Sequence, residues 1–180
     1  MRLTRREALV AGGGALVVPG ALAATAAADQ SGQTVIASVS AALTLELTAV
    51  EAYDFFLASG VLTGRTRAPL RRCRDQDLAH VHRLRVTIER LGGIPPHAPD
   101  PSSIPSLTDA TTESAALDFA TALEEQTIGA YMATMRLIYH RPLVRTVGSV
   151  MASDAQQLVV LRQLAGTPPV PSPFEQGSPP

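Results

Sequence analysis

The sequence predicts an all-α protein, folded as an antiparallel four-helix bundle with a long crossover between the second and third helices. Three observations lead to this prediction. Apolar residues recur at spacings of three and four in four separate segments, and no segment shows the alternation typical of a strand. A proline-rich stretch, far longer than a hairpin needs, separates the second segment from the third.

The four expected helices are bounded by glycines and prolines. They cover, approximately, residues 34–59, 69–91, 109–140 and 142–165. The second helix is expected to begin at Pro69, because proline suits a first helical turn, and to stop at Gly92. Pro142 is expected to end the third helix, with the fourth helix following directly.

The lengths of the connections predict the topology. The third and fourth helices are joined almost directly, so they should be antiparallel neighbours. Residues 92–108 contain five prolines and show no helical periodicity. An extended chain of that length reaches roughly 55 Å, enough to travel the length of a bundle. We therefore expect an up-down, crossover, down-up arrangement rather than a simple up-down-up-down bundle.

Composition excludes several classes of protein. The 180 residues carry a formal net charge of −1, which gives no support for nucleic-acid binding, because that function relies on clustered positive charge. The single cysteine excludes an intramolecular disulfide framework and a cysteine-based zinc finger. A length of 180 residues suits one domain.

The N-terminus has the pattern of an export signal over residues 1–28. A short basic segment precedes an uncharged run that ends in small residues, with A-x-A patterns that favour cleavage after Ala26 or Ala28. The adjacent Arg5 and Arg6 resemble a twin-arginine signal, with Thr4 in place of the usual Ser. The alternative is an uncleaved membrane anchor, since the run is long enough to span a bilayer. Its three glycines and proline favour cleavage.

Resemblance to a twin-arginine signal implies a bacterial protein that the twin-arginine machinery exports already folded. The mature protein would lie in the periplasm, cell envelope or extracellular space without a stable membrane anchor. Removal of residues 1–28 leaves a mildly acidic bundle domain over residues 29–166. Residues 167–180 form a proline-rich tail that we expect to be disordered.

The chain contains a weak internal repeat. LELTAVEAY (45–53) aligns with LEEQTIGAY (123–131) at an offset of 78, and DLAHVHRL (77–84) aligns with DAQQLVVL (154–161) at an offset of 77. Two helical hairpins of common ancestry would produce this pattern. A chance match among alanine-rich helices is the alternative.

Each expected helix carries one acid within its apolar stripe. These acids are Glu46, Asp77, Glu124 and Asp154, and they occupy matching positions of the repeat. An unpaired ionised carboxylate is very costly to bury, so each needs a metal ion, a proton or a strong partner. One such residue would carry little meaning, but one in every helix predicts a site.

This layout resembles the ferritin-like superfamily, whose carboxylate-bridged dimetal proteins take a Glu from two helices and a Glu-x-x-His from the other two. Glu46 and Glu124 match the lone carboxylates, whereas Asp77-x-x-His80 and Asp154-x-x-Gln157 match the pairs. The resemblance covers residues 34–166. It implies one or two iron or manganese ions, because hard oxygen donors with an imidazole suit those metals. The implied ligands are Glu46, Asp77, His80, Glu124 and Asp154.

Two departures from the family pattern leave alternatives open. Both paired carboxylates are the shorter Asp, and Gln157 stands where a second His belongs. One interpretation is an exported protein acting in metal handling or oxidative-stress redox chemistry at a degenerate site, with one metal ion or two. The other is a metal-free bundle with a structural or interaction role in the cell envelope, in which His80 hydrogen-bonds a core acid. The sequence singles out no catalytic residue.

Four further polar residues are assigned by the helical pattern. Tyr53 and Tyr131 lie two turns beyond the acids of their helices and are expected in the core. Cys73 shares the face of Asp77 and is expected to be a small buried hydrophobe. His82 falls on the opposite face and is expected to be exposed.

Overall fold

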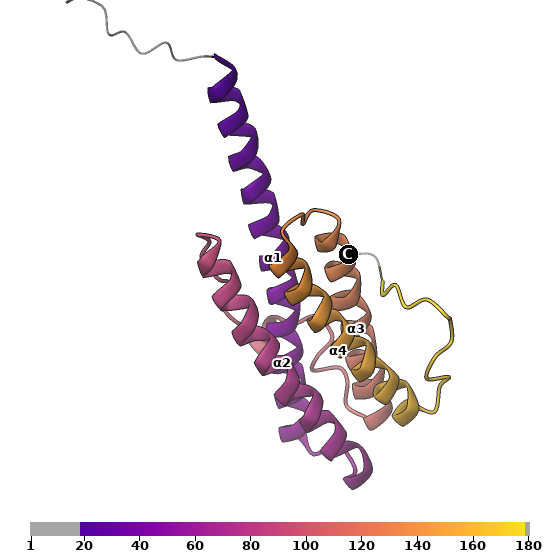
Figure 1. Cartoon of the computed structure of the whole chain (residues 1–180). Coiled ribbons are helices and arrows are strands. Elements are labelled where there is room, and N and C mark those ends of the chain that lie inside the picture. Colours follow the sequence, from indigo (N-terminus) through magenta and orange to yellow (C-terminus); the bar gives the residue numbers. More distant parts are fainter. Residues whose placement is uncertain (1–18, 179–180) are drawn as a thin grey trace, which may run out of the picture. The chain divides into compact units, whose positions relative to one another are not determined.

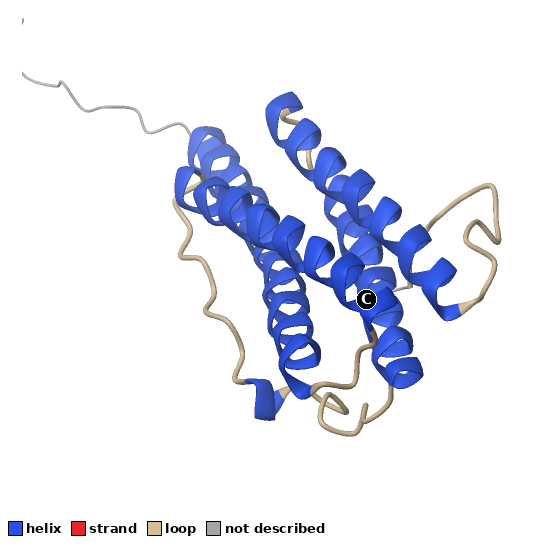
Figure 2. Cartoon of the chain, turned by 90° about the horizontal axis from the view of Figure 1, so that it is seen from below, coloured by secondary structure: helices blue, strands red, loops and turns tan. Residues whose placement is uncertain are grey.

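A computed structural model of the chain confirms the all-α prediction. It describes the backbone of residues 19–178 and the side chains of residues 31–178. The helices are α1 (Pro19–Ser59), α2 (Gly64–Arg90), a short 3₁₀ helix η1 (Pro101–Ser103), α3 (Glu113–Met135) and α4 (Arg141–Ala165) (Figure 1). Figure 2 shows that every regular element of this described part is helical.

The predicted signal peptide falls mostly outside the described residues. Residues 1–18, which include Arg5 and Arg6, are not part of the described chain, so the twin-arginine assignment stays a prediction. The chain divides into two compact units, Met1–Ser31 and Gly32–Pro180, and the four-helix bundle lies in the second. The backbone of residues 19–30 is helical, and an apolar N-terminal helix could be a signal sequence.

Helices α1 and α3 run antiparallel, and two hydrogen bonds fix their register. Tyr131 of α3 bonds to Glu46 of α1, and Tyr53 of α1 bonds to Glu124 of α3. Moving seven residues toward the C-terminus of α1 therefore moves the partner seven residues toward the N-terminus of α3. Both steps equal two helical turns.

Helices α2 and α4 are antiparallel by the same argument. Gln157 contacts Asp77, and Asp154 contacts His80, so three residues forward on α2 correspond to three residues backward on α4. Residues 91–112, with η1 among them, connect α2 to α3. Helices α3 and α4 pack against each other and are joined by residues 136–140 alone, so they are antiparallel as well, and the predicted up-down, crossover, down-up topology is confirmed.

Helix α2 begins earlier than the sequence pattern predicts. It starts at Gly64, so Pro69 lies inside the helix rather than in its first turn. The early start is held by Glu113, the first residue of α3, whose carboxylate accepts hydrogen bonds from the Thr63 backbone nitrogen at 2.5 Å and the Thr66 hydroxyl at 2.8 Å. The expectation that Pro69 marks the beginning of the helix was wrong, because this long-range anchor sets the boundary.

Helix α3 ends earlier than expected, at Met135 instead of near His140. Residues 136–140 form the connection to α4, and His140 is the extended N-cap of that helix. Pro142 therefore lies in the first turn of α4, where its missing N–H leaves no hydrogen bond unmade. The proline starts the fourth helix and does not terminate the third.

The bundle core consists of two hydrophobic clusters. One contains residues such as Phe56, Leu70, Leu117 and Leu161, and the other contains residues such as Leu43, Leu84, Tyr131 and Val147. In α2, α3 and α4 the site acids fall between the positions that contribute to one cluster and those that contribute to the other, whereas in α1 Glu46 lies among positions of the second cluster. The polar site thus forms a layer across the middle of the core.

The described part of α1 is also long and apolar enough to cross a membrane. The segment Ser31–Ser59 has a mean hydropathy of 1.5, and 44% of its most apolar window is buried inside the structure. Core helices of bundles pass the same test. Fully buried Val39, Leu43 and Phe56, together with buried Glu46, give this segment the pattern of a core helix.

The C-terminal tail makes defined contacts with the bundle. Glu175 pairs with Arg162 of α4 at 2.7 Å, and the Ser178 backbone nitrogen donates to the Glu125 carbonyl of α3 at 2.8 Å. Gly129 lies directly under the Ser178 carbonyl, where a larger side chain would clash. The domain boundaries and tail disorder expected from the sequence stay predictions.

Candidate metal centre

The four acids predicted to face the core are all buried. Glu46, Asp77, Glu124 and Asp154 have exposed fractions of 1%, 1%, 2% and 0%. Each comes from a different helix, and His80 and Gln157 lie one turn beyond the two aspartates on the same faces. The helical period places these six polar side chains on the inward faces, and the packing of the helices brings them into one layer.

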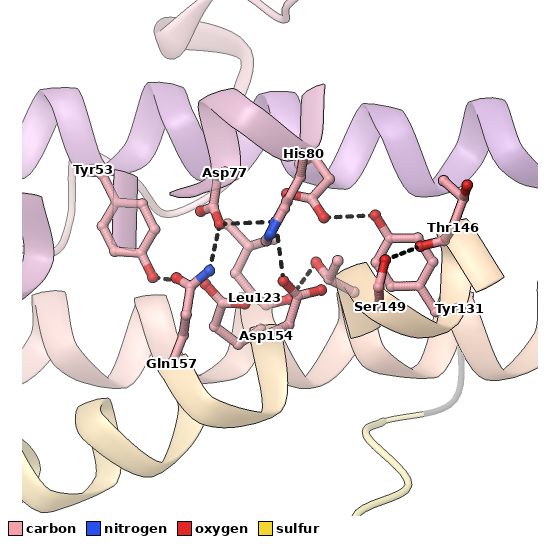
Figure 3. Close-up of polar contacts among 12 residues, drawn as sticks. Tyr53, Asp77, His80, Leu123, Tyr131, Thr146, Ser149, Asp154 and Gln157 are labelled. Carbon is pink, nitrogen blue, oxygen red and sulfur yellow. Dashed lines mark hydrogen bonds and ion pairs between the residues drawn. The ribbon is translucent and has the colours of Figure 1, made fainter. Parts of the chain in front are cut away.

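His80 is the centre of the cluster (Figure 3). Its Nδ1 atom lies 3.2 Å from Asp154 Oδ1, 3.3 Å from Glu46 Oε2 and 3.5 Å from Asp77 Oδ1. One ligand atom from each of these four residues lies within 4.8 Å of the others. Four of the five sequence-predicted ligands are therefore brought together.

Glu124, the fifth predicted ligand, lies outside this set of four. Its Oε1 accepts a 2.7 Å hydrogen bond from the Tyr53 hydroxyl. Burial raises the pKa of Glu124 well above its usual range, and the nearby Asp77, Asp154 and Glu46 raise it further. A protonated Glu124 bonded to Tyr53 is the form that this environment favours.

Gln157 hydrogen-bonds the cluster from α4. Its Nε2 donates to Asp77 Oδ1 at 2.7 Å, and its Oε1 has no hydrogen-bond partner in the described part of the chain. The amide occupies the repeat position that corresponds to His80. It therefore supplies a donor where an imidazole would supply a lone pair.

The two tyrosines are functional partners that the sequence pattern placed only as core residues. Tyr131 donates to Glu46 Oε1 at 2.6 Å, while the other oxygen of Glu46 faces His80. Tyr53 makes the equivalent bond to Glu124. The signal was present in the repeat, because each tyrosine follows its glutamate by the same two turns. Each tyrosine, however, bonds the glutamate of the other helix and not the glutamate of its own helix.

The cluster contains buried polar atoms that lack hydrogen-bond partners. Within the described residues these are Asp77 Oδ2, His80 Nδ1, both Asp154 carboxylate oxygens and Gln157 Oε1. Native proteins satisfy nearly all such atoms, so a concentration in one layer needs an explanation. A cation between the carboxylates and the imidazole satisfies most of them at once.

Burial and crowding shift the pKa values of the cluster upward. Burial raises the pKa of Glu46 to about 8 and that of Asp154 to about 6, although His80 opposes both shifts. Burial alone lowers the pKa of His80, but contacts with Asp154, Asp77 and Glu46 raise it to about 12. Without a metal ion, the layer therefore holds protons at neutral pH.

The donor set fits one metal ion better than two. One oxygen from each of three carboxylates and one imidazole nitrogen lie within 4.8 Å of one another, and this combination of donors suits iron or manganese. The second half of the family pattern has no imidazole, and its Glu124 is bonded to Tyr53. The two halves of the family pattern are therefore not equivalent in this structure.

A four-helix bundle with a long crossover and a buried carboxylate–histidine layer defines a carboxylate-type helical-bundle protein. The chain belongs to the ferritin-like domain family, whose model matches residues 34–167. The resemblance identified from the sequence is thereby confirmed.

The fold is also shared with a solved structure. A crystal structure of a conserved hypothetical protein from Mycobacterium tuberculosis matches with a TM-score of 0.69 and 15% sequence identity. The match covers 80% of this chain and 99% of that chain. A search of curated proteins finds no match.

Proposed function

We propose that this chain is an exported protein that binds iron or manganese through Glu46, Asp77, His80 and Asp154 and serves in metal handling or oxidative-stress redox chemistry. The observation that carries the proposal is the position of His80 Nδ1. It faces oxygens of three carboxylates from three helices at 3.2–3.5 Å and makes no hydrogen bond. One N–H group has no means of serving three acceptors, whereas a cation is coordinated by all of them.

The charge balance of the layer supports the same conclusion. Four carboxylates are buried there, and the only basic side chain that contacts them among the described residues is His80. Buried Arg162 pairs with Glu125 and Glu175 instead. A divalent ion offsets the surplus negative charge without three or more bound protons.

The surrounding residues hold the ligands in place. Tyr131 fixes one oxygen of Glu46 and leaves the other directed toward His80. Gln157 donates to Asp77 Oδ1, the same oxygen that lies 3.5 Å from His80 Nδ1, and so fixes the position of that carboxylate. A bound iron or manganese ion supplies one-electron redox chemistry and Lewis acidity at such a site. These supports keep the carboxylates in a ligand-ready arrangement.

The test is the metal content of protein purified after native export, measured by mass spectrometry of the elements. We expect stoichiometric iron or manganese in the wild type and its loss in His80→Ala. His82→Ala is the matched control, because His82 is exposed on the same helix. Metal below a tenth of an equivalent in the folded wild-type protein would sink the proposal.

Export is tested separately. Replacing Arg5 and Arg6 by Lys removes the twin-arginine pair while keeping the charge. We expect the variant to stay in the cytoplasm at precursor mass, whereas the wild type loses about 26–28 residues, as the A-x-A patterns predict. Equal export of the variant would contradict a twin-arginine route and leave metal binding untouched.

A metal-free structural role is the second candidate, and the charge of His80 favours it. Burial lowers the pKa of His80, but the neighbouring carboxylates raise it to about 12. The resulting imidazolium would pair with Asp154, Asp77 and Glu46. The two Tyr–Glu bonds would then complete a polar layer without any ion. This candidate predicts a melting temperature that neither a chelator nor added metal changes.

A further inference from the structure

The polar layer contains two half-sites, one around His80 and one around Gln157, and residues from both copies of the internal repeat contribute to each. Four pairs of positions correspond: Glu46 with Glu124, Tyr53 with Tyr131, Asp77 with Asp154, and His80 with Gln157. Three pairs are identical in residue type. The two half-sites therefore differ in chemistry at a single pair, the imidazole and the amide.

The half-site with the imidazole is open to a cation. His80 Nδ1 has no hydrogen-bond partner and lies among the oxygens of Glu46, Asp77 and Asp154. A neutral imidazole offers a lone pair at that atom. The oxygens that face it include atoms of Asp77 and Asp154, one from each repeat copy.

The half-site with the amide is closed by hydrogen bonds. Gln157 Nε2 donates to Asp77 Oδ1 at 2.7 Å, and an amide nitrogen has no lone pair available for a metal ion. The Tyr53 hydroxyl occupies Glu124 Oε1 at 2.7 Å. These two bonds engage one carboxylate oxygen each of Asp77 and Glu124 and leave Asp77 Oδ2 and Gln157 Oε1 without a partner among the described residues.

The two tyrosines show why the half-sites behave differently. Tyr131 bonds Glu46 through Oε1, and Glu46 still presents Oε2 to His80 at 3.3 Å. Glu124 has the same tyrosine bond but no imidazole opposite it, and it lies outside the group of converging ligand atoms. A tyrosine alone does not close a half-site, whereas the amide does.

We propose that the bundle holds a single metal ion per chain and that Gln157 is the residue that limits it to one. This inference rests on the proposed function, since it concerns the same metal. Gln157 replaces a second cation with a neutral hydrogen bond to Asp77. Restoring an imidazole at this position opens the second half-site, and placing an amide at His80 closes the first.

The test is equilibrium dialysis of the full mature chain against Mn²⁺, with bound metal counted per chain. We expect one ion in the wild type, two in Gln157→His and none in His80→Gln. Gln156→His is the control, because it adds the same imidazole one position away on the exposed face of α4, and it should bind one ion. Electron paramagnetic resonance should show an isolated ion in the wild type and an exchange-coupled pair in Gln157→His.

The outcomes separate this inference from the proposed function. Two ions in the wild type would overturn the role of Gln157 while metal binding stands, and so would one ion in a folded Gln157→His variant. No ion in the wild type would overturn both. Circular dichroism of each variant confirms folding, and if Gln157→His does not fold, the wild-type count and the spectrum of the bound ion decide the question.

Discussion

The Tyr131 hydroxyl of α3 donates a 2.6 Å hydrogen bond to Oε1 of Glu46 on α1, and it thereby directs the other carboxylate oxygen toward His80. We expect Tyr131→Phe to weaken metal binding by about 10-fold or more, the usual effect of losing a residue that orients a ligand. Leaving a buried carboxylate oxygen unpaired should also cost about 1–3 kcal/mol of stability. Isothermal titration with Mn²⁺ and thermal unfolding measure the two effects.

Tyr53→Phe is the matched control for that experiment. It removes the equivalent hydrogen bond from Glu124, which lies outside the group of converging ligands. We expect a similar loss of stability and an unchanged Kd for the metal. Equal weakening of metal binding by the two tyrosine substitutions would contradict the assignment of Glu46 as the ligand.

Metal affinity should rise with pH across the neutral range. Binding requires an ionised Glu46, whose pKa burial raises to about 8, and an ionised Asp154, whose pKa burial raises to about 6. His80, with its pKa raised to about 12, must also lose a proton. The ion therefore displaces protons, and the apparent Kd should fall steadily between pH 6 and pH 8. A pH-independent Kd would show that other groups bind the metal.

The metal-free protein should lose stability as pH rises. The folded pKa of Glu46, about 8, exceeds its ordinary value of 4.5, so the folded state binds more protons than the unfolded state between those values. His80 acts in the same direction between 6.5 and about 12. The contribution of protonated Glu46 to the free energy of unfolding is complete below pH 4.5 and is lost as the pH rises past about 8.

The melting temperature in the presence of a chelator measures this dependence. It should be lower at pH 9 than at pH 6, and added Mn²⁺ should restore more stability at the higher pH. Glu46→Gln, which mimics the protonated side chain, should flatten part of the slope. A melting temperature that rises with pH without metal would contradict the burial of protonated acids.

The C-terminal tail should detach when its contacts are removed. Glu175 pairs with Arg162, and Gly129 admits the Ser178 carbonyl against α3. We expect Glu175→Ala and Gly129→Ala each to increase proteolytic cleavage within residues 167–178, with the metal content unchanged. Arg136→Ala is a suitable control, because Arg136 lies near the tail residues without bonding to them in the described structure. Unchanged cleavage in both variants would show that the tail is not held there.

The sequence allowed the faces of the helices and their order to be predicted. A period of 3.6 residues places Glu46 with Leu43 and Val50 on one side of its helix, whatever its partners are, and all three are buried. The segment 92–108 is longer than a hairpin loop requires, and this length predicted the crossover topology. Both inferences use local spacing or chain reach, which need no knowledge of packing.

Contacts between helices could not be predicted from local sequence spacing. The Tyr53–Glu124 and Tyr131–Glu46 bonds depend on the register of α1 against α3, which only the packed core determines. The same holds for the start of α2, where Glu113 from a distant helix sets the boundary that Pro69 was expected to mark. The separation of Glu124 from the other ligands likewise depends on helix packing, since Glu46 has an equivalent tyrosine partner and still faces His80.

The most direct test of the central claim is anomalous X-ray diffraction at the iron and manganese absorption edges from crystals of the natively exported protein. The account predicts one anomalous peak per chain within coordination distance of Glu46, Asp77, His80 and Asp154, and none between Glu124 and Gln157. A peak that lies outside these four residues, or the lack of any peak at the cluster, would contradict it.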